Sequence, residues 1–137
     1  METDFRAALL AHAAVAAILD GPSRIAWGRL PQGEDLPFIC LQRISGGYDY
    51  TQRGRVGTET PLVQIDCYAG TYAAAEALAA AVITAIDSFT TTPWQGVFLL
   101  DRRADDSFEG APGADTSADI YRTSLDVRVT WTFAPKP

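Results

Sequence analysis

Histidine and cysteine are scarce in this chain, which has one histidine, His12, and two cysteines, Cys40 and Cys67. Nucleophilic catalysis of the serine or cysteine type needs a base beside the nucleophile, and a zinc site needs three or four ligands. The single histidine is distant in sequence from both cysteines, and no CxxC spacing occurs. We therefore expect no catalytic triad and no metal site, and we interpret the cysteines as buried, reduced thiols.

Phosphate-binding glycine motifs are also missing. The chain has no GxxxxGK[ST] loop, and the glycines of segment 46–57 lie between expected strands, without a helix N-terminus to hold phosphate. Asp105 and Asp106 could act as acid and base or bind magnesium, but solvated charge in an acidic loop is the simpler interpretation. We expect no enzymatic activity and no cofactor.

Basic residues are too few for a protein that binds nucleic acid on its own. Eleven lysines and arginines stand against seventeen acids, which gives a net charge of −6. Binding to a phosphate backbone by counterion release needs the opposite balance. An acidic wall past which DNA slides without binding is compatible with this composition.

No apolar run is long enough to span a membrane. The stretch from Ala7 to Leu19 is mostly alanine and is interrupted by His12, and a spanning helix needs about 20 residues. The first four residues include two acids, where a signal peptide would carry positive charge. The length of 137 residues suits one domain, so we expect a single domain over 1–137 in the cytosol or in a particle, without membrane contact.

Two segments have the spacing of amphipathic helices. The first is expected to begin after Thr3 or Asp4 and to end near Leu19, and the second runs from about residue 72 to Ser88. Each is followed by a proline-containing break. The apolar stripes are Phe5, Leu9, His12, Ala16 and Leu19 in the first helix, and Ala75, Leu78, Ala79, Val82, Ile86 and Phe89 in the second.

The remaining regular segments have the pattern of strands, which we expect at 24–28, 38–45, 61–68, 97–100 and 121–133. The last is the clearest, because apolar residues and threonine occupy its odd positions while polar residues occupy the even ones. One face of that strand is therefore expected to be buried and the other polar. On the polar face we expect Arg122, Asp126 and Arg128 to contact a neighbouring subunit or a lumen.

Two long segments show no consistent period. Segment 46–57 is either a mobile loop or the tip of a hairpin, and its tyrosines and arginines are typical of an interface once ordered. A solvated tip without a partner is the alternative. Segment 107–118, which follows the acidic residues 105 and 106, is expected to be a second loop. The predicted interface residues in these segments are Tyr48, Tyr50, Arg53, Arg55 and Phe108.

The expected order of elements is α-β-β-β-α-β-β. An α+β fold accommodates it, with one antiparallel or mixed sheet of four to five strands and two helices packed on one face. The other face is polar, and it is either exposed to solvent or available for contact with a neighbouring subunit.

Three segments together carry a resemblance to a known family: 30–46, 63–69 and 71–77. With the opening helix, they resemble the tail-completion, or tail-terminator, proteins of long-tailed, siphovirus-like phages and gene transfer agents. None of these segments is catalytic.

The resemblance implies a structural virion protein assembled in the bacterial cytoplasm. It would form a hexameric ring at the head-proximal end of the tail, stopping polymerisation of the major tail tube protein and docking the head-tail connector or stopper protein. DNA would only pass through the lumen. The resemblance also implies that the segment Tyr48 to Val56 makes contacts. The alternative hypothesis is a stand-alone small-ligand-binding or regulatory α+β domain that uses the Tyr/Arg loop as a lid.

Overall fold

A computed structural model describes residues 2–19, 24–28, 37–45, 48–52, 54–90, 94–108 and 120–132. It is an α+β fold, as the sequence predicts. The helices are α1 (Glu2–Ala11), α2 (Ala13–Leu19) and α3 (Tyr72–Asp87). The strands are β1 (Ile25–Trp27), β2 (Phe38–Ser45), β3 (Tyr48–Thr51), β4 (Gly54–Glu59), β5 (Leu62–Ala69), β6 (Trp94–Phe108) and β7 (Ile120–Thr132).

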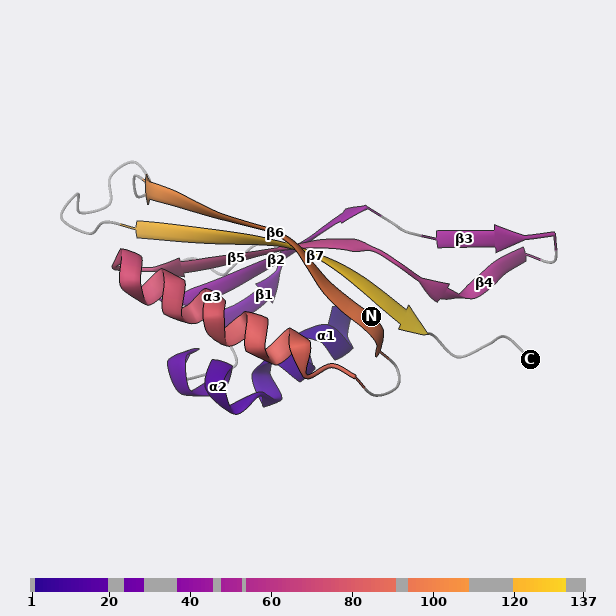
Figure 1. Cartoon of the computed structure of the whole chain (residues 1–137), viewed down its shortest axis with the longest axis horizontal. Coiled ribbons are helices and arrows are strands. Elements are labelled where there is room, and N and C mark those ends of the chain that lie inside the picture. The colour runs from indigo at the N-terminus through magenta and orange to yellow at the C-terminus, as the bar shows by residue number, and fades with distance from the viewer. Residues whose placement is uncertain are drawn as a thin grey trace.

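All of these strands belong to one mixed sheet with the order β1-β2-β5-β7-β4-β3, and β6 pairs with β7. Only β1 runs parallel to its partner, β2. β7 pairs with β5 over residues 121–128, with β4 at residues 131 and 132, and with β6 along most of its length. Because a strand has two edges, β6 occupies one edge of β7 and is the last strand at that end of the sheet. The helices lie together on one face of the sheet (Figure 1).

The five expected strands are present as β1, β2, β5, β6 and β7. Segment 46–57, expected to be a loop or a hairpin tip, contributes β3 and most of β4, so the hairpin alternative holds. The last but one strand does not end near residue 100 but continues to Phe108. Its polar second half stays in the sheet because β7 offers backbone partners as far as Ile120. The predicted loop 107–118 therefore loses its first two residues to β6, and residues 109–119 lie outside the described part.

The first helix is broken at His12 and not continuous. The His12 amide donates to the Leu9 carbonyl at 3.2 Å, and the regular pattern resumes when the Ala16 amide donates to the His12 carbonyl at 2.9 Å. A straight helix would carry His12 and Ala16 into the core. The break buries Val15 in place of Ala16, which is exposed, while Leu19 stays buried as predicted. The larger apolar side chains gain more from burial, which accounts for the change of face. None of the helices in the described part is long and apolar enough to cross a bilayer.

The core lies between the helices and the inner face of the sheet. The predicted stripe of the second helix is confirmed, since its six members are all buried. In β7 the odd positions from 123 to 129 are buried, as the alternation predicts. At one end of this core the Phe5 ring, fully buried, is surrounded by the rings of Trp27, Phe89 and Trp94, at centroid distances of 6.1, 5.9 and 5.8 Å.

Thr71 caps the N-terminus of α3, because its Oγ1 accepts a hydrogen bond from the Ala74 amide at 3.1 Å. Replacing Thr71 with alanine is expected to lower the free energy of unfolding by about 1 kcal/mol. Thr84→Ala is the matched control: its hydroxyl donates to the Ala80 carbonyl within the same helix, an interaction that adds little to helix stability. Urea unfolding of both variants measures the difference. Equal losses of unfolding free energy in the two variants would show that the Thr71 cap stabilises the protein no more than the Thr84 hydroxyl does.

Candidate assembly surfaces

The hairpin formed by β3 and β4, called the arm below, projects from the body of the molecule (Figure 1). Tyr50 lies opposite Arg55 in its register, and Tyr48 lies nearer its base. The ladder between the arm and the body consists of Thr58 and Glu59 of β4 against the end of β7. Three of the predicted interface residues, Tyr48, Tyr50 and Arg55, are thus brought together on the arm. Arg53 lies outside the described residues.

Phe108 is not near the arm. It pairs with Ile120 at the start of β7, whereas the arm joins β7 at Trp131 and Thr132. Twelve residue steps separate Ile120 from Thr132, and at the usual rise of a strand they span roughly 40 Å. The five predicted interface residues therefore do not form one cluster, because the hairpin of β6 and β7 carries Phe108 to the opposite end of the sheet.

Arg122, Asp126 and Arg128 share the face of β7 that the helices leave open, as the alternation predicts. Arg128 is exposed, and the other two are half-buried. Arg122 lies opposite Tyr68 of β5 in the register. Burial raises the pKa of the Tyr68 hydroxyl, and a hydrogen bond with Arg122 partly offsets that rise.

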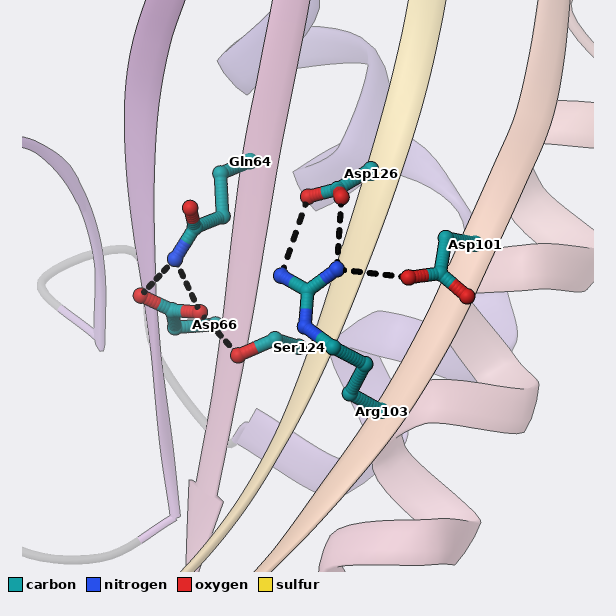
Figure 2. A network of polar contacts seen from close by, with 6 residues as sticks. All are labelled: Gln64, Asp66, Asp101, Arg103, Ser124 and Asp126. Carbon is teal, nitrogen blue, oxygen red and sulfur yellow. Dashed lines mark hydrogen bonds and ion pairs between the residues drawn. The ribbon is translucent and has the colours of Figure 1, made fainter.

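Asp126 takes part in an ion-pair network across β7 and β6 that the sequence analysis did not find (Figure 2). The Arg103 guanidinium donates to Asp126 with Nη1 at 2.6 Å and Nη2 at 3.3 Å, and Nη1 also lies 2.7 Å from an Asp101 carboxylate oxygen. The two acids raise the pKa of Arg103. Two carboxylates share one guanidinium here, so the network of these three side chains carries a net charge of −1.

A second polar cluster on the same face is buried and joins β5 to β7. The Ser124 hydroxyl donates to Asp66 Oδ1 at 2.6 Å, and the Gln64 side-chain amide donates to both Asp66 oxygens at 3.0 and 3.1 Å (Figure 2). The alternation in segment 61–68 placed Gln64 and Asp66 on this face. The register that sets Asp66 opposite Ser124 had no signal in the sequence.

On the helix-covered face, Glu76 of α3 connects the helix to the sheet. It forms an ion pair with Arg102 of β6 and accepts a hydrogen bond from the Thr123 hydroxyl at 3.0 Å. Arg102 and Arg103 are neighbours in a strand, so they point to opposite faces. Consecutive arginines therefore serve two different networks.

β6 also carries exposed apolar side chains that the sequence analysis did not single out. Phe98 is 59% exposed, Leu100 49% and Leu99 38%. The Phe98 ring lies against the Gly96 backbone, since a Cβ added at Gly96 would come within 2.5 Å of it. The signal was present in the sequence as the unbroken apolar run from Val97 to Leu100.

Cys67 is buried, as predicted, and Cys40 is partly exposed. Burial, with a smaller contribution from the Asp66 charge, raises the pKa of the Cys67 thiol far above the ordinary value of 9.0. Among the described residues, no three histidine, cysteine, aspartate or glutamate side chains gather closely enough to hold a metal ion.

The raised pKa predicts that the protein loses stability in alkali. An unfolded thiol ionises above pH 9.0 while the buried thiol stays protonated, so the stabilisation is complete below that pH and declines above it. The expected slope is about 1.4 kcal/mol per pH unit. Cys67→Ala should be about 1 kcal/mol less stable than the parent at pH 7, but its free energy of unfolding should not fall through this thiol above pH 9.0. Urea unfolding of both proteins between pH 7 and pH 10 tests this prediction. A stability that falls equally with pH in both proteins would contradict it.

Comparison with known proteins gives two consistent results. The family model for tail completion protein gp17 matches residues 3–131. The fold is similar to that of a chain in the structure of the virion of a native gene transfer agent particle, with a TM-score of 0.64, 19% sequence identity, and coverage of 94% of this chain and 92% of that one. A comparison with curated proteins gave no match. Because the family model spans nearly the whole sequence, this chain belongs to the tail completion protein gp17 family and is a structural protein of a phage-type tail.

Proposed function

We propose that this protein forms a hexameric ring at the head-proximal end of a tail tube, where it stops polymerisation of the tube and joins the tail to the head connector. Membership of the tail completion family supports a location in the tail. The fold shared with a chain of a gene transfer agent virion supports a location in a phage or gene transfer agent particle. The observation that carries the ring is the arm, which extends from the body by a short ladder and whose outer strand, β3, pairs only with β4 among the described residues.

A ring of identical subunits needs two different, complementary surfaces on each copy, because each contact joins unlike patches. The arm is one protruding surface. The open sheet face and the β6 edge are separate surfaces on the body. A lid over a small-ligand site would have to fold back over the body, whereas the arm points away from the sheet and the helices (Figure 1). This geometry favours the ring over the ligand-binding alternative, and the role is structural and not catalytic.

The charge of the chain suits a lumen through which DNA passes. The net charge is −6, which is a property of the whole chain, while on the open face Arg122 and Arg128 lie beside the network of Asp101, Arg103 and Asp126. A net negative ring would repel phosphate, so DNA would pass through the lumen without being retained.

Mass measurement tests the proposal directly. The purified chain should have the mass of six copies in native buffer, or should be a monomer that becomes a hexamer when polymerised tube protein is added. Electron microscopy of the mixture should show rings at one end of each tube. A chain that stays monomeric in both conditions and is missing from particle fractions would refute the proposal.

Reversing the charge of Asp126 is expected to reduce assembly more than monomer stability. Asp126→Lys replaces the partner of Arg103 by a like charge, but Arg103 is partly exposed, so the loss of unfolding free energy should stay below about 1 kcal/mol. Asp87→Lys, the same charge change at an exposed position at the end of α3, is the control. For both variants, native mass measures assembly and urea unfolding measures the stability of the monomer. Equal losses of assembly and stability would contradict a contact role for Asp126.

A further inference from the structure

The two ends of the sheet differ in how their backbone edges are protected. At one end β1 has three residues, and the Ile25 carbonyl accepts a hydrogen bond from Arg6 Nε at 2.8 Å. Arg6 belongs to α1, which packs beside β1 (Figure 1). A short strand capped by a side chain offers no run of free backbone groups for another chain.

At the other end lies β6, which is 15 residues long and pairs, among the described residues, with β7 alone. Its outer edge therefore presents unpaired amides and carbonyls, together with the exposed side chains of Phe98, Leu99 and Leu100. A long edge strand with exposed apolar residues is a template for a strand from another chain.

Irregularities divide this edge into short regular runs. The register with β7 shifts between Trp94 and Gly96, between Leu99 and Asp101, and between Asp105 and Phe108. Bulges of this kind limit unrestricted pairing along an edge. The regular runs are 96–99 and 101–105, so the strand that this edge can accept is about four or five residues long.

The same chain supplies a free strand of matching length. β3 has four residues, Tyr48 to Thr51, and pairs only with β4 within the described part. Two of its four residues are tyrosines, a residue type that is enriched at interfaces. Asp49 is its single charged residue. A two-stranded hairpin is only marginally stable in water, so the arm gains from such a partner.

We propose that β3 of one copy adds to the β6 edge of the next copy, so that the sheet continues from subunit to subunit. This inference rests on the proposed ring and names its inter-subunit contact. Each copy has one arm and one open edge, and the contact joins unlike surfaces. Repetition of such a contact gives a closed ring when the rotations between successive copies add up to a full turn.

Engineered cysteines test the contact in the full chain. Cys40→Ser serves as the background, and Cys67 is retained because it is buried and its thiol stays protonated. With Tyr50→Cys and Phe98→Cys in the same chain, oxidation should give a ladder of covalent oligomers up to the ring. Each single substitution should give no ladder. Dimers from Phe98→Cys alone would mean that two β6 edges pair with each other, and this result would overturn the proposal.

A second pair of variants needs no cross-linking. Phe98→Lys with Leu100→Lys places charge on the edge and should lower the fraction of assembled ring at least tenfold, with a melting temperature close to that of the parent. Ile44→Lys is the control, because Ile44 is 51% exposed on β2, away from this edge. Wild-type assembly by the edge variant would overturn the proposal.

Native mass of the parent separates this inference from the proposed function. If the parent forms a ring but the double-cysteine variant gives no ladder, the proposed β3–β6 contact is wrong and the ring stands. A parent that stays monomeric with and without tube protein loses both.

Discussion

Replacing Phe5 with alanine is expected to lower the free energy of unfolding by about 4 kcal/mol. The ring is fully buried and makes edge or tilted contacts with Trp27, Phe89 and Trp94, so its removal leaves a cavity and ends three aromatic contacts. These partners join α1, β1, the end of α3 and the start of β6. For a chain of this length the loss corresponds to a fall in melting temperature of about 15 °C, which calorimetry measures.

Phe98→Ala is the control for this prediction, because it removes the same side chain from a position that is 59% exposed. Its cost in the monomer should be below about 1 kcal/mol. Similar losses in the two variants would mean that the cluster around Phe5 does not hold the helices on the sheet.

Deleting residues 47–54 is expected to abolish ring formation while leaving the body folded. The deletion removes β3 and the tip of the arm, but it spares Thr58 and Glu59, through which β4 pairs with β7. Because an isolated hairpin contributes little stability, the melting temperature should change by only a few degrees. In particles, the deletion should give tails that are detached or too long.

Native mass and electron microscopy of particles carrying the deletion check this result. Circular dichroism and the melting temperature of the purified variant show whether the body is intact. A deletion variant that assembles normally would contradict the role of the arm in ring formation and would support the alternative in which the Tyr/Arg segment is a lid.

The spacing of apolar residues was enough to predict the buried face of a helix or strand wherever that face depends on the element's own periodicity. The stripe of α3 predicted its buried face because helical spacing fixes which residues share a side, and all six residues are buried. The alternation in β7 predicted both its buried face and the shared open face of Arg122, Asp126 and Arg128 for the same reason. The mixed character of the sheet, left open by the sequence, comes from β1 alone.

Local patterns failed where pairing or packing between distant segments decided the outcome. The polar half of β6 has no strand pattern, and it stays extended because β7 provides a ladder. The break at His12 follows from which face of the helix the core could bury best. Phe108 and the tyrosines looked like members of one interface, but the sheet separates them.

The sequence by itself determined the class of the fold, the inner faces of α3 and β7 and the absence of the common catalytic motifs, because composition, periodicity and motif spacing are properties of the chain alone. The tertiary structure alone decided the register, and with it the contact of Asp66 with Ser124 and of Arg103 with Asp126. It also decided which strand ends the sheet with an open edge. These features depend on partners far apart in the chain, whose pairing is selected by the free energy of the whole sheet.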